Sequence, residues 1–313
     1  MSRSARKNSR FRPIMSRHSA TRRNFLLRAA SFAVAALPFS LPRRTVQAEQ
    51  PVVGTDETII LKRLGRGIDD NMSRLPLGAL VAKIGREFLG RPYEANTLEE
   101  PGDEHLVVNL RGFDCVTLCE TSLAMARSLR LHENSVKAYC AHLQRIRYRS
   151  GIIDGYTSRL HYFSEWIADN EKKKILRDVT KELGGRRDRR TLDFMSSHRE
   201  SYPRLASAGD AAAIVSVEKR LSGTPRYVLP KEEVNGVLEL IQDGDIIAVT
   251  TSVAGLDISH TGIAVREGGT TRLLHAPNVG HQVQISAGSL SEYLAAHGTQ
   301  TGIMVARPLD PQS

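Results

Sequence analysis

Apolar residues in the first half of the chain recur at the three- and four-residue spacing of amphipathic helices. One helix is predicted over residues 55–72, with its buried face formed by Ile59, Ile60, Leu64 and Ile68. A second is predicted over residues 77–88, with its inward positions at Leu80, Val81, Ile84 and Phe88. The Gly-Arg-Pro-Tyr segment at residues 90–93 ends that helix, and residues 107–110 read as a short extended run before the next helix.

After residue 244 the pattern changes to short apolar strands. Strands are predicted over 246–250, 259–266, 271–276, 282–286 and 302–307, with a short helix over 289–296. Because the connections are short, the sheet should be largely antiparallel. Residues 130–230 are more charged and more helical, and the charge-rich run 171–190 reads as a solvated surface segment. The predicted fold class is α+β, with a helix packed on a mainly antiparallel sheet and an additional helical segment at about 130–230.

Two histidines are placed on one face of this sheet by a turn. The sequence Glu267-Gly268-Gly269-Thr270 is typical of a two-residue hairpin loop, which pairs Glu267 with Thr270. In that register His260 and His275 are diagonal neighbours, roughly 7–8 Å apart between Cα atoms. One imidazole can then act as a base while the other fixes its tautomer. A one-residue slip of the register would separate them.

A cysteine stands at the predicted start of a helix. Gly112 interrupts the preceding segment and Asp114 is a good N-cap, which puts Cys115 in the first helical turn. Unpaired N–H groups and the helix dipole favour a thiolate there, although the carboxylate of Asp114 opposes it. The alternative interpretation is a small buried residue on an apolar helix face.

The basic excess of the chain belongs to its N-terminus. The formal net charge is +10, but 11 of the 44 Lys and Arg residues lie within residues 1–48, which contain no acid. The remaining 33 balance 34 acidic residues, so no nucleic-acid-binding surface is predicted.

This leader reads as an export signal. Arg22-Arg23 followed by an apolar run is typical of a twin-arginine signal, and Val46-Gln47-Ala48 is a suitable cleavage site. The apolar run is too short to span a bilayer. We therefore predict a twin-arginine signal peptide over 1–48, a periplasmic domain over 49–313, and no stable membrane insertion after cleavage.

Three cysteines remain after the leader, which leaves at least one thiol free. A disulfide between Cys119 and Cys140 would leave Cys115 free, but the sequence does not determine that pairing. Cys115 and Cys119 are one helical turn apart, so a shared metal is conceivable. No second close pair of Cys or His ligands accompanies them, and no metal site is predicted.

The motifs Phe113-Asp114-Cys115, 259–264 (Ser-His-Thr-Gly-Ile-Ala) and Leu274-His275-Ala276 resemble the NlpC/p60 superfamily of papain-like cysteine hydrolases. Residues 90–93 resemble its tyrosine-bearing motif. Together with Ile146-Arg147-Tyr148, residues 159–163 (Arg-Leu-His-Tyr-Phe) and Gly255 to Asp257, they resemble more closely its N-acetylmuramoyl-L-alanine amidase-like branch, long labelled a domain of unknown function. The resemblance covers about residues 60–308.

This resemblance implies cleavage of the amide between the muramic-acid lactyl group and L-alanine in peptidoglycan fragments. It implies no cofactor, a nucleophile at Cys115, a base at His260 and an orienting residue at His275. We expect the substrate to contact Tyr93, Arg159, His161 and Tyr162. The segment that also holds Trp166 could instead be a packed amphipathic helix; as a ligand wall, its aromatic rings suit a sugar face and Arg159 suits a stem carboxylate.

Three other functions remain open at this point. An endopeptidase cutting within the stem peptide would use the same residues, because both bonds are amides. A non-catalytic cell-wall-binding protein could keep the fold, and a zinc amidase would need metal ligands. The sequence does not predict the oligomeric state.

Overall fold

The computed structural model describes residues 54–69 and 72–312, so the predicted leader lies outside the described residues. The α-helices are α1 Gly54–Asp69, α2 Leu77–Arg86, α3 Cys115–Arg130, α4 Val136–Arg147, α5 Phe163–Lys172, α6 Phe194–Ser197, α7 Ala208–Gly223 and α8 Leu290–Ala295. The strands are β1 Leu176–Asp178, β2 Arg186–Asp188, β3 Arg226–Pro230, β4 Ile246–Thr251, β5 Ile258–Glu267, β6 Thr270–His275, β7 Gln284–Ile285 and β8 Gln300–Pro308. Short 3₁₀ segments join them, among them η6 Lys231–Val237. None of the described helices is long and apolar enough to cross a membrane.

The strands form one sheet with the order β2-β3-β8-β4-β5-β6-β7, and β1 pairs with β8 beyond the end of β3. Every strand pair is antiparallel, as predicted. In the β5–β6 hairpin Glu267 pairs with Thr270, which confirms the predicted register. Gly268 and Gly269 have φ of 58° and 78°, a turn conformation that glycine adopts without strain.

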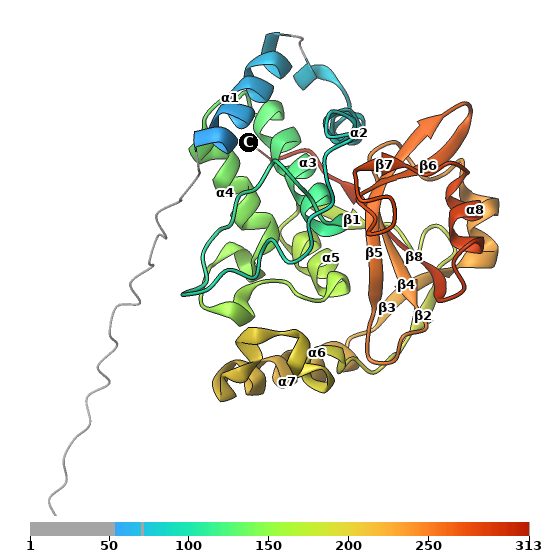
Figure 1. Ribbon diagram of the computed structural model, residues 1–313. Helices are drawn as coiled ribbons and strands as arrows, with labels where there is room; N and C mark the ends of the chain where they lie inside the picture. The colour runs from blue at the N-terminus through green and yellow to red at the C-terminus, as the bar shows by residue number, and fades with distance from the viewer. Residues whose placement is uncertain (1–53, 70–71, 313) are drawn as a thin grey trace, which may run out of the picture. The chain divides into compact units, whose positions relative to one another are not determined.

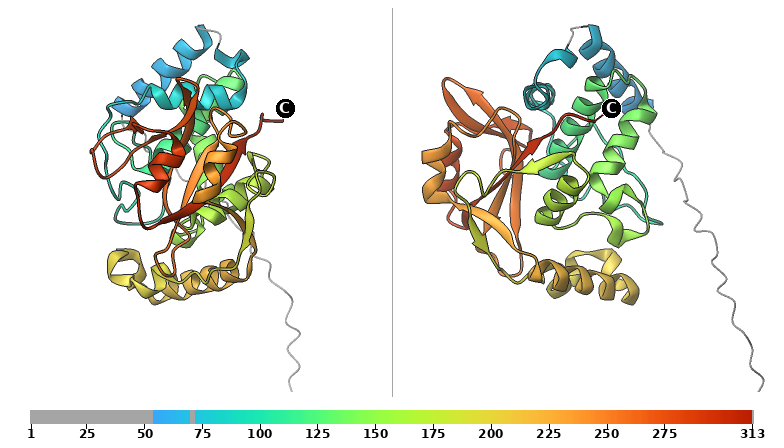
Figure 2. Two further views of the ribbon diagram at one scale, coloured as in Figure 1. Left: turned by 90° about the vertical axis from the view of Figure 1, so that its right-hand side faces the viewer. Right: turned by 180° about the vertical axis from the view of Figure 1, so that it is seen from behind.

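The sheet lies between two layers of helix (Figures 1 and 2). On one face α2 and α3 bury the larger apolar core, which includes Ile263 and Leu274 of the hairpin. On the other face α8 and η6 cover a second core, which includes Ala264 and Leu273. The alternation of these neighbouring residues between the two cores is the two-residue period of a strand buried on both faces. A Cβ at Gly85 would meet Leu274 and Ile263 at 2.7 and 3.0 Å, so glycine lets α2 lie close to the sheet.

Helix α3 is the central helix of the larger core. Every residue from Thr117 to Leu129 is buried, and the helix contacts α2, α4 and β5. Its N-terminus is fixed by a capping box, in which the Asp114 carboxylate accepts from the Thr117 N–H at 2.7 Å. The Asp114 N–H donates in turn to the Thr117 hydroxyl. The predicted N-cap is therefore confirmed, and Cys115 is the first residue of the helix.

Several other predictions of secondary structure need correction. Residues 107–110, predicted as a short extended run, belong to no strand of the sheet. Helix α4 begins at Val136, after the N-cap Ser135. The first helix is described as far as Asp69, and Met72 belongs to a 3₁₀ segment. Ile60 and Leu64 are buried as predicted, and the side chain of Ile68 lies outside the described part.

The segment 171–190 is more than a solvated surface run. It supplies β1, which pairs with the C-terminal half of β8, and β2, which forms one edge of the sheet. The stretch 130–230 therefore contributes three strands as well as helices. The sequence pattern did not predict β1 and β2, because β2 is exposed on the sheet edge and β1 buries only one side chain fully, Leu176.

Candidate active site

The predicted nucleophile and base lie where β5 has an open side. Among the described residues β6 pairs with β5 only over Ile263–Glu267, so the first residues of β5 lack a partner on that side. There the Thr261 hydroxyl donates to the backbone carbonyl of Cys115 at 2.8 Å and accepts from the Cys119 thiol at 3.8 Å. This contact fixes the N-terminus of α3 against the strand that carries His260.

His260 and His275 are in direct contact, as the hairpin register predicts. Nε2 of His260 lies 2.8 Å from Nδ1 of His275, and the two rings are nearly perpendicular at 79°. His275 is 2% exposed, whereas His260 is partly exposed. Both face the α8 side of the sheet, where the Tyr293 ring lies 6.3 Å from His260 and 5.1 Å from His275 between centroids.

Two tyrosines lie within electrostatic reach of the Cys115 sulfur. Burial, and then the negative charge of Cys115, raises the pKa of Tyr93. Burial and the same charge also raise the pKa of Tyr293, against a hydrogen bond to Gln300 that lowers it. Tyr293 belongs to α8 and Tyr93 to the loop before α3, so both elements come near Cys115. Tyr293 was missed as a site residue, although the predicted helix over 289–296 contains it.

The thiol and both imidazoles are uncharged at neutral pH. Burial and the neighbouring Asp114 raise the pKa of Cys115 to about 11, although the residue is partly exposed. Burial lowers the pKa of His260 to about 4 and, together with the charge of His260, that of His275 to about 3. The N-terminus of α3 favours a thiolate at Cys115, whereas burial and Asp114 favour the thiol.

A cavity of about 300 Å³ opens beside Cys115 and is called the α5 cavity. Its walls include Cys115, Thr261, Asp257 and three of the predicted substrate residues, Arg159, His161 and Tyr162. His260, His275 and Tyr93 do not line it. Trp166 does not line it either, because its ring is buried and its indole N–H donates to Glu120 at 3.1 Å.

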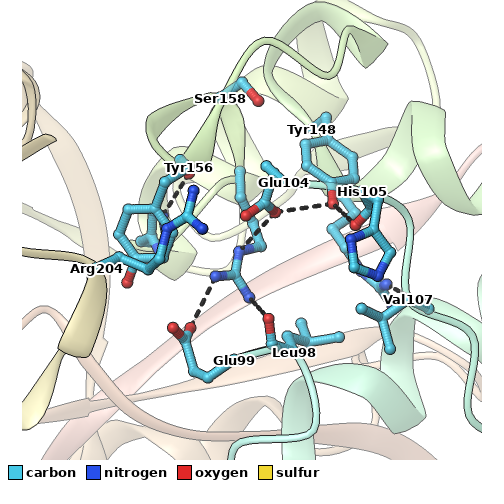
Figure 3. Close-up of polar contacts among 12 residues, drawn as sticks. Leu98, Glu99, Glu104, His105, Val107, Tyr148, Tyr156, Ser158 and Arg204 are labelled. Atoms are coloured by element: carbon cyan, nitrogen blue, oxygen red, sulfur yellow. Dashed lines mark hydrogen bonds and ion pairs between the residues drawn. The ribbon is translucent and has the colours of Figure 1, made fainter. Parts of the chain in front are cut away.

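Arg159 is held by the protein itself. Its guanidinium donates to Glu99 at 2.7 Å and to the Leu98 carbonyl at 2.9 Å, and it lies 3.2 Å from Glu104 (Figure 3). It is 5% exposed and stacks over the Tyr156 ring at 5.1 Å. Glu99 and Glu104 thus neutralise Arg159, the cation that was predicted to bind a stem carboxylate.

His161 and Tyr162 are also committed to internal contacts. The His161 Nε2–H donates to the Tyr156 carbonyl at 2.9 Å, and burial with the charge of Arg159 lowers its pKa to about 3. The Tyr162 hydroxyl donates to Glu218 of α7 at 2.7 Å and accepts from the Met195 N–H of α6 at 3.1 Å. These side chains shape the cavity wall, and their role in binding a substrate stays a prediction.

The three cysteines are unpaired: Cys119 and Cys140 are buried, and Cys115 is partly exposed. Within residues 54–69 and 72–312 no group of three or more His, Cys, Asp or Glu side chains is arranged to hold a metal ion.

A model of N-acetylmuramoyl-L-alanine amidase-like proteins matches residues 83–302, which span the cysteine, both histidines and the α5 cavity. The chain belongs to this amidase-like family. A crystal structure of an N-acetylmuramoyl-L-alanine amidase from Bacteroides uniformis is 40% identical with a TM-score of 0.72, covering 75% of this chain and 99% of that one. No curated protein matches the chain.

Two further solved structures are similar to this amidase-like chain. One is a Bacteroides fragilis protein described as a proposed xylanase; it is 41% identical with a TM-score of 0.69, over 72% of this chain and 99% of that one. The other, from Legionella pneumophila, is 19% identical with a TM-score of 0.61 over 82% and 96% of the two chains, and supports the fold alone.

Acid is expected to destabilise the fold through its buried histidines. His275 and His161 keep lowered pKa values when folded but titrate near 6.5 when unfolded. Between those values the unfolded chain binds more protons, so stability falls with decreasing pH by up to about 1.4 kcal/mol per pH unit for each histidine. Thermal melting followed by circular dichroism from pH 7 to 4.5 tests this. His161→Gln should flatten the slope, and a melting temperature independent of pH would contradict the expectation.

Proposed function

We propose that this chain is a periplasmic cysteine amidase that cleaves the bond between N-acetylmuramic acid and L-alanine in peptidoglycan fragments. The observation that carries the proposal is the 2.8 Å contact between His260 and His275, next to the strand residue that holds Cys115. Membership of the amidase-like family supports the substrate class. The chain order of helix cysteine and two strand histidines supports a papain-like mechanism of the NlpC/p60 kind.

In this mechanism His260 removes the thiol proton as the Cys115 sulfur attacks the lactyl carbonyl carbon. His275 accepts the His260 Nε2–H at its Nδ1, which leaves Nδ1 of His260 as the basic nitrogen. Backbone N–H groups at the start of α3 stabilise the oxyanion. His260 then protonates the departing L-alanine amine, and water attacks the thioester to release the muramic lactyl carboxylate.

A glycosidase is the alternative that the Bacteroides fragilis relative raises. Such enzymes need two carboxyl groups facing the glycosidic bond. The carboxylates in the α5 cavity are engaged elsewhere: Asp114 caps α3, Glu120 pairs with Arg147, Asp257 accepts from two backbone N–H groups, and Glu99 pairs with Arg159. This arrangement favours the amidase over the glycosidase.

Digestion of defined muropeptides should release an intact stem peptide that begins with L-alanine. The sugar product should carry a free lactyl carboxylate, since the scissile carbonyl belongs to that group. Mass spectrometry of both products checks this expectation. A sugar that keeps a dipeptide would instead identify an endopeptidase, with Cys115, His260 and His275 in the same roles, and release of free sugar by glycosidic cleavage would contradict both.

Export is expected to depend on the paired arginines of the leader. Changing Arg22 and Arg23 to lysine should trap full-length protein in the cytoplasm, while the same change at Arg43 and Arg44 should have less effect. Cell fractionation with N-terminal sequencing measures this, and mature protein should begin at Glu49. Mature periplasmic protein from the Arg22/Arg23 variant would refute the twin-arginine route.

A further inference from the structure

One edge of the sheet carries a hollow that the candidate active site does not use. Strand β2 forms this edge (Figure 1). Between β2 and the C-terminal end of α7 lies a hollow of about 270 Å³, which is called the β2 hollow. It is lined by Arg187, Arg189, Ser222, Gly223, Thr224 and Pro225. None of these residues lines the α5 cavity, so the β2 hollow is separate from the centre at Cys115.

The strand register gathers three exposed cations at this edge. Arg187 is paired with Tyr227 of β3, so their side chains lie on the same face of the sheet. Arg189, two residues further on, lines the same hollow as Arg187. Nζ of Lys181 lies 5.3 Å from the centroid of the Tyr227 ring, which brings a third cation to this face. The edge cations are therefore Lys181, Arg187 and Arg189, and all three are exposed.

The edge cations have no partner within the part of the chain that the structure describes. None of them forms an ion pair or a side-chain hydrogen bond there. The acidic residues next to them in the chain are already paired, Glu182 with Arg177 and Asp188 with Arg226, each at 2.8 Å. The positive charge at this edge is therefore not neutralised by the protein, although the charge-rich run 171–190 contains acids as well as bases.

The C-terminus of α7, which forms the other wall of the β2 hollow, opposes an anion only weakly. A helix C-terminus carries a partial negative charge of about half an elementary charge. Two of the last carbonyls of α7 are already occupied. The Arg220 carbonyl accepts from the Thr224 hydroxyl at 2.9 Å, and the Leu221 carbonyl accepts from the Thr224 N–H at 3.0 Å. The full charges of the edge cations outweigh this end of the helix, so the hollow attracts anions.

Two arginines that line one hollow match a phosphate group better than a carboxylate. One guanidinium can satisfy both oxygens of a carboxylate in a bidentate pair, which would leave the second arginine without a partner. A phosphate group has more oxygens and a larger negative charge, so it can accept from Arg187 and Arg189 together. The hydroxyls of Ser222 and Thr224 donate to carbonyls of α7, at 2.8 and 2.9 Å. The arginines must therefore supply the hydrogen bonds to the anion.

We propose that the β2 hollow is a phosphate-binding site, in which Arg187 and Arg189 hold the phosphate group and Lys181 adds its charge beside the Tyr227 ring. Two sources of ligand share this chemistry: a soluble phosphate or phosphate ester, and the headgroup of an anionic phospholipid. The site does not depend on the proposed amidase function, because it shares no residue with the α5 cavity or with the two catalytic histidines.

Titration with inorganic phosphate at constant ionic strength tests the site. In protein labelled with ¹⁵N-arginine, the Nε–H signals of Arg187 and Arg189 should shift with phosphate and reach saturation. The signal of Arg186 should stay in place, because this residue pairs with Val228 on the other face of β2 and its guanidinium contacts Glu233. Acetate should cause smaller shifts than phosphate. Equal shifts of Arg186 and Arg187 that do not saturate would show a general ionic effect and overturn the proposal.

Arg186 and Arg187 provide a matched pair of variants, since both are exposed and adjacent in β2. Arg187→Ala should weaken phosphate binding about tenfold or more, as followed by the signal of Arg189, because a charge-assisted contact is lost. Arg187→Lys should recover only part of the affinity, since lysine keeps the charge but not the planar fork. Arg186→Ala removes the same charge and should leave the affinity nearly unchanged. An equal loss in Arg186→Ala and Arg187→Ala would overturn the proposed site.

Vesicles distinguish the two sources of the phosphate group. Sedimentation with phosphatidylglycerol vesicles is compared between Arg186→Ala and the double variant Arg187→Ala/Arg189→Ala, with phosphatidylcholine vesicles as the uncharged control. The arginines of residues 1–48 are the same in both proteins, so they do not affect the comparison. Weaker sedimentation of the double variant alone would support a phospholipid headgroup as the ligand. Equal sedimentation, with phosphate binding lost only in the double variant, would support a soluble phosphate. Unchanged binding of both phosphate and vesicles by the double variant would refute the site.

Discussion

Replacing Cys115 by serine should lower amidase turnover by roughly 10³-fold or more while the protein stays folded. The hydroxyl has nearly the same size as the thiol, and the capping box of Asp114 and Thr117 does not involve the cysteine side chain. What is lost is the nucleophile, because a serine hydroxyl is far harder to deprotonate with a histidine of lowered pKa. Steady-state kinetics on a muropeptide, with thermal melting beside it, measures the effect.

Cys119 supplies the matched control, since it lies one helical turn further along α3. Its thiol is buried, donates to Thr261 at 3.8 Å, and has a pKa raised by burial. Cys119→Ser can keep that hydrogen bond and should retain most of the activity. Iodoacetamide should modify the partly exposed Cys115 before the two buried cysteines. If folded Cys119→Ser protein lost turnover and Cys115→Ser protein kept it, the nucleophile would be assigned to the wrong sulfur.

The second large effect is on stability. Glu120 of α3 and Arg147 of α4 are 1% and 3% exposed, and Nε of the arginine donates to the carboxylate at 2.7 Å. The other Glu120 oxygen accepts from Trp166 at 3.1 Å. Glu120→Ala removes the partner of the buried Arg147 cation and leaves the Trp166 indole N–H unpaired. The free energy of unfolding should therefore fall by about 3–5 kcal/mol. Urea unfolding would show this as a lower midpoint at an unchanged m-value.

Two comparisons separate the buried pair from ordinary charge effects. The exposed pair Arg177–Glu182 is 2.8 Å apart, with side chains 47% and 58% exposed. Glu182→Ala should cost less than about 1 kcal/mol. The double variant Glu120→Leu/Arg147→Met should recover part of the stability lost in Glu120→Ala, because no unpaired charge remains. A cost for Glu120→Ala as small as that for Glu182→Ala would show that Arg147 finds another partner or water.

The catalytic residues of the candidate site could be predicted from the sequence, but the contacts of the substrate residues could not. The cysteine at the helix start and the paired histidines could be predicted, because a local N-cap and a two-glycine turn determine them. The internal contacts of the predicted substrate residues could not be predicted from the sequence. Arg159 reads as an available cation, but Glu99 and Glu104, about 60 residues away in sequence, neutralise it. Such pairing depends on tertiary contacts that have no local pattern.

The pKa of Cys115 and the strands β1 and β2 also depend on tertiary contacts that a local sequence pattern does not show. The position of Cys115 at a helix N-terminus indicated a thiolate, yet burial raises its pKa, and burial is a property of the whole fold. Strands β1 and β2 are three residues long and rich in arginine, so their composition resembles that of a surface loop. Their partners, β8 and β3, determine that they are strands.

The place of β8 in the sheet has a consequence for the order of folding. This strand pairs with β4 along one side and with β3 and β1 along the other. Until residues 300–308 have left the ribosome, β4 lacks one of its neighbours and β1 lacks the partner it has among the described strands. The sheet therefore cannot close before β8 is available, and its formation waits for contacts of long sequence separation, which form slowly. A chain that stops before residue 300 would expose the edge of β4 and would be prone to aggregate.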